Sequence, residues 1–579
     1  MKVLLLFPPC WHPLMPHLAL PSLTAYLRRE GVEVIQRDLN LELYDEVLSR
    51  HHLTAVLQQL QRAERVQGKS RVRSTAEAQA RSWALSVGRD LVSRIEQAKD
   101  IIRSSRFYEA AAGLQALLAV TDGLRLASTP YYPAELHLTG YDSPYPVDAA
   151  AAILTATRSR DYNLFYDHFA RLVIPQIARD RPDLIGISVT SDRQVIAAFT
   201  LAYLLKEAGV QAHITLGGKM MTCWRDLWPG KLHLFPFVDS IILYAGEVPL
   251  HRLSSALAGD GALRDVPNLI YREGNRVAVN EIAPPVPVDA LPLPDFQGLP
   301  LRRYLVPATV LPISGSRGCY WHRCAFCNVG YGESAFYAEK QADRVYAEMR
   351  ALAERWNVRH FFFSDEAVSP RILKLLSRRL LESDLRVHWT GAARFEPSLD
   401  ATTLQQIARA GCRMLMYGLE SGSPTVLARM HKGIELDTAR RILRDGATAG
   451  IWNHIFFFFG FPGETRQEAE ETIRFFRENA AYIHSACTGT FLLERHSAVA
   501  ARPQDYDISR ITHPYDRDMP FYYDYRVDCG IDAHEAEQIE SDFLDTLPQK
   551  ERAHLYYHDI YRFLYASQFQ PGESFPPML

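Results

Sequence analysis

Apolar runs of strand length alternate with helical stretches from the start of the chain. Lys2 to Phe7 is almost entirely apolar, residues 21–30 carry the apolar spacing of one helix, and residues 32–36 form a second short apolar run. This pattern predicts a β-α-β unit. Residues from about 45 to 125 instead combine Arg, Gln, Glu and Ala with helical periodicity, which predicts a helical insertion packed on the first domain.

The alternation resumes near residue 184. Apolar strands are predicted at 184–189, 212–216 and 240–244, with a helix at about 195–208. Strands separated by helices favour a parallel, doubly wound sheet, in which ligands bind beyond the carboxyl ends of the strands. Small or turn-forming residues that could face such a ligand occupy these ends: Pro8, Pro9, Ser188, Gly217, Gly218, Gly246 and Glu247.

A Pro-rich passage separates this series from a second one. Prolines lack the amide donor of regular structure, so residues 284–305 are predicted to be a linker between a first domain at 1–283 and a second at 306–505. Six β-α repeats in the second domain indicate a partial (β/α)6 barrel with its site at the strand carboxyl ends. Residues 506–579 are predicted to be a small helical extension. The six strands are expected at 310–314, 358–363, 387–391, 413–418, 452–459 and 489–493.

Composition and charge narrow the class of protein. The chain has 579 residues, 47% of them hydrophobic and 23% charged, with 64 Lys and Arg against 67 Asp and Glu. A net charge of -3 argues against a main function in binding nucleic acid or anionic membranes. No run approaches the roughly 18 apolar residues of a membrane span, and the N-terminus does not read as a signal peptide. A cytoplasmic enzyme is therefore expected.

Three of the eight cysteines are crowded into one short stretch. Cys319, Cys324 and Cys327 are separated by four and then two residues in SGSRGCYWHRCAFCNVG. Three thiolates on one loop can converge on a soft metal. Zinc would need a fourth ligand, for which His322 is the local candidate. An iron–sulfur cluster with three protein ligands and one open iron explains the count better.

This motif resembles that of the radical S-adenosylmethionine (radical SAM) superfamily, in a form found among cobalamin-binding members. The resemblance covers nearly the whole chain, although the usual motif has three residues between its first two cysteines and this one has four. It implies that the three cysteines hold a [4Fe-4S] cluster whose fourth iron binds S-adenosylmethionine, and that Phe326 lies against the adenine. Further contacts with S-adenosylmethionine are implied at the strand ends: Glu366, Arg394, Glu420, Ser421 and Gly460.

The first domain resembles the cobalamin-binding module of this class. Its loops at 188–194, 217–222 and 244–249 match the cofactor-facing loops of that module. The Asp-x-His-x-x-Gly signature, whose histidine ligates cobalt from below, is absent, and the pattern fails at His12 because Pro13 follows. The resemblance therefore implies cobalamin without that histidine ligand. A degenerate domain that keeps the fold without the cofactor is the alternative.

The resemblance implies a methyltransferase that acts through a 5'-deoxyadenosyl radical on an unactivated carbon of a small-molecule or peptide natural-product precursor. A flavodoxin or ferredoxin is the expected electron donor. The first alternative is a radical SAM oxidoreductase, cyclase or rearrangement enzyme without cobalt chemistry. The second, from another class, is a zinc-stabilised binding protein without catalysis. No residue is assigned as a catalytic acid or base from the sequence.

Overall fold

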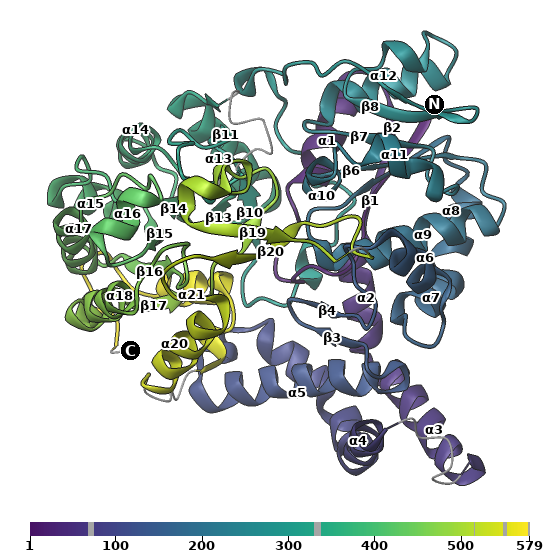
Figure 1. Cartoon of the computed structure of the whole chain (residues 1–579), viewed down its shortest axis with the longest axis horizontal. Helices are drawn as coiled ribbons and strands as arrows, with labels where there is room; N and C mark the ends of the chain where they lie inside the picture. Colours follow the sequence, from purple (N-terminus) through teal and green to yellow (C-terminus); the bar gives the residue numbers. More distant parts are fainter. Residues whose placement is uncertain (68–73, 329–336, 515, 548–552, 577–579) are drawn as a thin grey trace. The chain divides into compact units, whose positions relative to one another are not determined.

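A computed structural model describes residues 1–67, 74–328, 337–514, 516–547 and 553–576 (Figure 1). The chain forms two compact units. Unit 1 comprises residues 1–286, 291–307 and 515–519, and unit 2 comprises 287–290, 308–514 and 520–579. None of the described helices combines the length and the apolar character that crossing a membrane would require.

Unit 1 is built on a seven-stranded sheet in the order β2-β1-β5-β6-β7-β8-β9. The first five strands of this order are parallel, and an antiparallel hairpin of β8 and β9 completes the edge. The strands are β1 (Lys2–Phe7), β2 (Glu33–Asp38), β5 (Leu184–Ser188), β6 (His213–Gly217), β7 (Ser240–Ile242), β8 (Leu269–Glu273) and β9 (Arg276–Val279).

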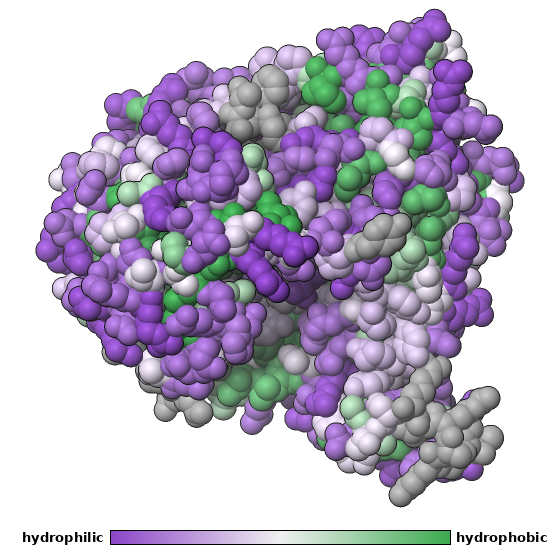
Figure 2. Space-filling model, in the orientation of Figure 1, coloured by the Kyte–Doolittle hydropathy of each residue, from purple (hydrophilic) through white to green (hydrophobic). Residues whose placement is uncertain are grey.

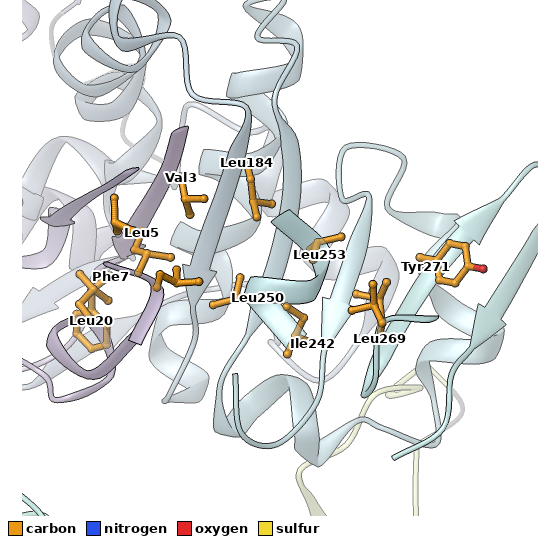
Figure 3. Packing of buried hydrophobic residues seen from close by; sticks show 13 residues of the cluster. Val3, Leu5, Phe7, Leu20, Leu184, Ile242, Leu250, Leu253, Leu269 and Tyr271 are labelled. Atoms are coloured by element: carbon orange, nitrogen blue, oxygen red, sulfur yellow. The ribbon is translucent and has the colours of Figure 1, made fainter. Parts of the chain in front are cut away.

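The core of unit 1 lies between this sheet and its helices. Strand residues Val3, Leu5 and Leu184 pack with Leu250 and Leu253 of α12 (Glu247–Leu257), as Figure 3 shows. All five are at most 5% exposed. At about 25 cal/mol per Å² of apolar surface, such burial is the main stabilising contribution to the unit.

The helical insertion is present in unit 1 as predicted. It consists of α2 (Leu39–Val47), α3 (Arg50–Gln67), α4 (Thr75–Ile102) and α5 (Ala110–Ser128). Ser74 begins α4 because its side chain accepts a hydrogen bond from the Glu77 amide. The remaining helices of the unit are α1 (Ala19–Arg29), α6 (Ala150–Arg158), α7 (Leu164–His168), α8 (Ile174–Asp180), α9 (Val195–Glu207), α10 (Lys219–Cys223) and α11 (Trp228–Lys231), and a small hairpin joins β3 (Glu135–His137) and β4 (Gly140–Asp142).

Most of the Pro-rich passage belongs to unit 1, which includes residues 284–286 and 291–305, while residues 287–290 belong to unit 2. Asp295 forms an ion pair with Arg28 at 2.6 Å, and the Gln36 side chain donates to the Asp295 carbonyl at 2.7 Å. Further along the passage, the Tyr304 hydroxyl donates to the Asp38 carboxylate at 2.6 Å. These side-chain contacts hold the passage on unit 1, although its prolines lack the amide donor of regular structure.

Unit 2 contains a six-stranded parallel sheet in the order β10-β13-β14-β15-β16-β17, which confirms the predicted six-strand barrel series. Its strands are β10 (Val310–Ile313), β13 (His360–Phe363), β14 (His388–Ala393), β15 (Cys412–Glu420), β16 (Trp452–Phe457) and β17 (Ser485–Cys487). The intervening helices are α13 (Ala342–Trp356), α14 (Pro370–Leu381), α15 (Ala401–Arg409), α16 (Pro424–Arg429), α17 (Leu436–Thr448) and α18 (Arg466–Glu478).

The position predicted for the sixth strand was wrong. That strand is β17, and residues 489–493 lie beyond it, with a single bridge from Thr490 to Phe459. The apolar run that suggested a strand there ends in β18 (Leu493–Glu494), which pairs antiparallel with another segment. A glycine at 489, which disfavours regular strand structure, lies between the two short strands.

The C-terminal extension contains the expected helices and two strands that were not predicted. Its helices are α20 (Ala533–Asp545) and α21 (Asp559–Ala566), preceded by the short α19 (Ala498–Ala501). Strands β19 (Ile508–Thr512) and β20 (Tyr522–Val527) join β18 in a small antiparallel sheet. On the face shown in Figure 2, hydrophilic residues predominate and hydrophobic ones are scattered between them, as expected where apolar helix faces cover a sheet.

Candidate functional site

The cysteine loop, residues 319–327, lies beyond the carboxyl end of β10 and follows the two-residue strand β11 (Ser316–Arg317), which pairs with β12 (Ala338–Glu339). Cys319, Cys324 and Cys327 are all partly buried. Among the described residues, no group of three or more His, Cys, Asp or Glu side chains is gathered closely enough to hold a metal ion. The site is therefore judged from its donor set and its surroundings.

The second half of the loop is anchored by contacts with distant parts of unit 2. The Ala325 amide donates to the Met430 carbonyl at 2.8 Å, and the Ala325 carbonyl accepts from the Val499 amide at 3.1 Å. The Asn328 side chain donates to the Arg495 carbonyl at 2.8 Å. The path of the loop is thus fixed by backbone hydrogen bonds that do not depend on a bound metal.

Two buried cations lie near the loop. Burial raises the pKa of Cys324, while the charges of Lys432 and Arg394 act in the opposite direction. Lys432 forms an ion pair with Glu420 at 2.6 Å, and their side chains are 8% and 13% exposed. Cations beside a thiol favour its thiolate form, which is the form that binds metals. Three thiols on one short loop, with two cations near Cys324, fit the donor set of a soft metal centre such as an iron–sulfur cluster.

The alternative fourth ligand, His322, lies on the exposed side of the loop. Its Nδ1 is 3.3 Å from the Cys319 carbonyl oxygen within the same turn. The residue has a φ of +37°, so the backbone passes through the left-handed region at this point. The described residues show no Cys and His group of metal-binding geometry around it.

Residue 420 ends β15 in an unusual conformation. A register irregularity separates Gly418 from Glu420, and Glu420 has a φ of +66°. A side chain at Gly418 would place its Cβ 2.3 Å from the Glu420 Oε1 and 2.8 Å from the Lys432 Nζ. A side chain at 418 would therefore displace the two charged groups from the positions that they hold.

Other predicted strand-end residues have partners within the protein. Arg394 is 4% exposed, and its guanidinium donates to Glu396 at 3.1 Å and to the Lys432 carbonyl at 2.6 Å. Ser421 is fully buried, with its hydroxyl 3.1 Å from that of Thr472 in α18. These contacts fix the loops on which the residues lie.

Three predicted residues differ in their surroundings. Phe326 meets Phe458 edge to face at 5.3 Å between ring centroids, which places an aromatic wall beside the cysteine loop. Gly460 has a φ of +82° and donates its amide to the Glu464 carboxylate at 2.6 Å. Glu366 is exposed.

Two buried carboxylates at the strand ends were not among the predicted site residues. Asp365 accepts hydrogen bonds from the Gly315 amide at 2.8 Å and from the Ser316 hydroxyl at 2.5 Å. Burial raises the pKa of Asp365 to about 6 and that of Glu464 to about 7. Glu366 and Gly460 were predicted from the sequence as site residues, and these two carboxylates were not. The burial of an acidic residue in a loop cannot be predicted from the sequence around it.

In unit 1 the predicted loop residues gather at the carboxyl edge of the parallel strands. Pro8 and Pro9 follow β1, and the Gln194 side chain donates to the Pro8 carbonyl at 2.6 Å. The carbonyl oxygen of the same Gln194 side chain accepts from the amides of Thr190 and Ser191 at 2.8 and 3.1 Å. One glutamine thus joins the loops that follow two neighbouring strands.

The next two loops are joined in a similar way. Ser188 pairs with Gly217 across β5 and β6, and Thr222 accepts a hydrogen bond from the Tyr244 amide at 2.8 Å. Gly218 has a φ of +96°, and a Cβ there would lie 2.5 Å from the Val189 carbonyl. Gly246 and Glu247 begin α12, where Glu247 is 5% exposed. These contacts link the loops that follow β5, β6 and β7 at one edge of the sheet, where Ser188, Gly217 and Gly218 are small residues.

One part of unit 2 is similar to a known protein family. Residues 313–476 match the family model of the Radical SAM superfamily. The chain therefore combines a region similar to the Radical SAM superfamily, which includes strands β13 to β16, with a doubly wound α/β unit. This similarity does not favour the alternative given in the sequence analysis, a zinc-stabilised binding protein without catalysis.

Solved structures of similar fold belong to cobalamin-dependent enzymes. The cobalamin-dependent S-adenosylmethionine radical enzyme OxsB, with aqua-cobalamin and S-adenosylmethionine bound, matches with a TM-score of 0.60 and 14% identity over 98% of this chain and 72% of that chain. The radical S-adenosylmethionine methyltransferase TsrM from Kitasatospora setae, with cobalamin and a [4Fe-4S] cluster bound, matches with a TM-score of 0.57 and 14% identity over 94% and 89%. These matches confirm the predicted fold.

Two curated relatives are methyltransferases by name. An uncharacterized methyltransferase of Pyrococcus horikoshii is 27% identical over 303 residues, and the bacteriochlorophyllide d C-12(1)-methyltransferase of Chlorobaculum tepidum is 27% identical over 217. The matched regions are 51% and 36% of this chain. They span 64% and 45% of the relatives' own lengths, so less than two thirds of either relative is represented.

Proposed function

We propose that this protein is a cobalamin-dependent radical SAM methyltransferase that acts on an unactivated carbon of a small-molecule or peptide precursor. The observation that carries the proposal is the cysteine loop at the carboxyl end of the barrel strands, with Lys432 and Arg394 beside Cys324. The doubly wound first unit and the two methyltransferase relatives favour methyl transfer over other radical reactions.

In this proposal Cys319, Cys324 and Cys327 would hold the [4Fe-4S] cluster. Together with S-adenosylmethionine and methylcobalamin, such a cluster supplies a 5'-deoxyadenosyl radical and a methyl donor for carbon. The protein contributes the surroundings: burial raises the pKa of Cys324 and the charges of Lys432 and Arg394 oppose that rise, while Phe326 and Phe458 provide an apolar wall. Apolar walls exclude water, which protects a reactive centre.

The first unit would hold cobalamin on the loops at 188–194, 217–222 and 244–249. Its corrin would lack the histidine ligand of the Asp-x-His-x-x-Gly type, because the motif is absent from the sequence. His12, the one histidine considered for that position, is 8% exposed.

A one-electron donor of the flavodoxin or ferredoxin class would reduce the cluster, and the reaction would take place in the cytoplasm. His322 and Arg323 leave part of the cysteine loop exposed. This exposure supports the proposal of electron entry from a second protein, because electron transfer requires close approach of the donor.

The test is anaerobic reconstitution with iron, sulfide and hydroxocobalamin, followed by metal analysis and absorption spectroscopy. About four irons per chain, a retained corrin, and formation of 5'-deoxyadenosine from S-adenosylmethionine are expected. A triple alanine variant of the loop cysteines should lose the iron, while Cys529→Ala, which removes an exposed thiol elsewhere in unit 2, should keep it. Bound iron without a retained corrin would refute cobalamin-dependent methyl transfer and favour a radical SAM reaction without cobalt. Bound zinc in place of iron would refute the proposal as a whole.

A further inference from the structure

The cysteine loop has one more spacer residue than the usual radical SAM motif, and the structure shows where the additional length goes. Tyr320, Trp321, His322 and Arg323 separate the first two cysteines. Within this spacer, His322 has a left-handed backbone conformation with a φ of +37°. Tyr320 donates its hydroxyl to Glu396 at 3.0 Å, so the first spacer residue is already tied to the end of the third barrel strand.

The second spacer residue, Trp321, contacts the turn that joins α16 to α17. Its Nε1 donates to the His431 carbonyl at 2.9 Å. Its ring occupies the space beside Gly433, where a Cβ would lie only 2.1 Å from a ring carbon. Gly433 has a φ of +65°, so both the conformation and the packing require glycine at this position.

Lys432 lies between the two residues that Trp321 contacts. Its own backbone carbonyl accepts a hydrogen bond from Arg394 at 2.6 Å, and the Arg394 Cζ lies 4.2 Å from the centroid of the Trp321 ring. An arginine over the face of a tryptophan is an attractive cation–π contact. Trp321 therefore contacts the residues on both sides of Lys432 and also the arginine that donates to the Lys432 carbonyl. These contacts hold the Lys432 backbone in place.

The Lys432 ammonium in turn holds the strand-end carboxylate. Its Nζ lies 2.6 Å from the Glu420 Oε1, and Glu420 is the residue predicted to contact S-adenosylmethionine after β15. Lys432 is 6% exposed, so no bulk solvent is available to replace a lost partner. A shift of the turn at 431–433 would move the ammonium and with it the carboxylate.

We propose that Trp321 is a positioning residue for S-adenosylmethionine. By fixing the turn at 431–433 it sets the place of the Lys432–Glu420 ion pair, and the longer cysteine spacer thereby couples the cluster loop to the S-adenosylmethionine contact. The cofactor part of this inference rests on the proposed function. The structural part concerns only residues of this chain and can be tested without any cofactor.

The cofactor-free test measures the accessibility of Lys432 by amine acetylation and peptide mass spectrometry. Trp321→Ala is expected to raise the acetylation rate of Lys432 at least tenfold. Lys340 is the matched control, since it is 4% exposed against 6% for Lys432 and is paired with Glu348 at 2.7 Å in the same unit. Lys432 remaining protected in the variant would overturn the proposal. If both lysines become reactive, the variant has unfolded, and Trp321→Phe, which loses only the Nε1 hydrogen bond, decides.

The second test measures S-adenosylmethionine binding to reconstituted protein. Trp321→Ala should retain the iron of the wild type while its dissociation constant for S-adenosylmethionine rises about tenfold, and Trp321→Phe should show a smaller rise, as expected for one hydrogen bond. Cys529→Ala, at an exposed position of unit 2 outside the cysteine loop, should leave affinity unchanged. Unchanged affinity in Trp321→Ala would overturn the coupling. Absence of iron in the wild type would refute the proposed function instead, and the acetylation result would still decide the structural part.

Discussion

The buried carboxyl group of Glu464 is expected to make the stability of unit 2 depend on pH in a defined direction. Its side chain is fully buried, and its Oε2 accepts hydrogen bonds from the amides of Gly460 and Phe461 at 2.6 and 3.3 Å. The Oε1 is buried without a hydrogen-bond partner. Burial raises the pKa from 4.5 to about 7, against the effect of the two amides.

The sign of the effect follows from proton binding. Between pH 4.5 and about 7 the native carboxyl group keeps a proton that the unfolded chain releases, so stability falls as the pH rises through this window. At about 1.4 kcal/mol for each pH unit, the loss amounts to roughly 3 kcal/mol. Glu464→Gln resembles the protonated acid, so it should match the wild type at pH 4.5 and be more stable by up to about 3 kcal/mol at pH 8.

The measurement has to be local, because a chain of two units need not unfold in one step. Hydrogen exchange of peptides from β16 and α18 in increasing urea, at several pH values, reports the unfolding of this part of unit 2. Glu470→Gln is the matched control, because it removes an exposed carboxylate from α18, the helix that follows Glu464. An identical pH dependence in wild type and Glu464→Gln would refute the assignment of the proton to this group.

Two further substitutions test the two edges predicted to bind cofactors. Gly218→Ala should destabilise unit 1 by more than about 2 kcal/mol, because its Cβ would lie 2.5 Å from the Val189 carbonyl. The control Gly209→Ala has a φ of +73° but open space around it, so it should cost only about 1 kcal/mol for the unfavourable backbone conformation. Equal losses of thermal stability in the two variants would contradict this prediction. Glu420→Gln should keep the iron but bind S-adenosylmethionine about tenfold more weakly, because a neutral amide holds the Lys432 ammonium less tightly than a carboxylate does. Equilibrium dialysis measures this affinity. An unchanged affinity would show that Glu420 is not part of the site.

Much of the fold could be predicted because buried parallel strands read as continuous apolar runs. The strand at 2–7 and the strands at 184–188 and 213–217 were found from this signal. Short strands at the ends of the series were harder to place. Ser485–Cys487 has too few apolar residues to stand out, and the more apolar run that follows it drew the prediction away.

The cysteines of the candidate site could be predicted from spacing, but most of the groups around them could not. Lys432 lies 108 positions after Cys324 in the sequence, and no local pattern marks it as a buried cation. Arg394 was predicted to contact the cofactor. In the structure its guanidinium donates hydrogen bonds to Glu396 and to the Lys432 carbonyl. Residue type and position at a strand end indicate a site, but only the fold decides which partner a side chain meets first.

The glycines at the strand ends of unit 1 show the same limit in a more physical form. All of them suggested close approach of a ligand, yet their backbones differ. Gly218 is needed by the chain itself, since its φ is +96° and its α-carbon faces the Val189 carbonyl. A Cβ at Gly217 would meet the Ile242 carbonyl at 3.5 Å, an ordinary contact. The absence of a side chain at 217 therefore has no explanation in the packing of unit 1, which makes Gly217 the glycine whose replacement by alanine separates cofactor binding from folding.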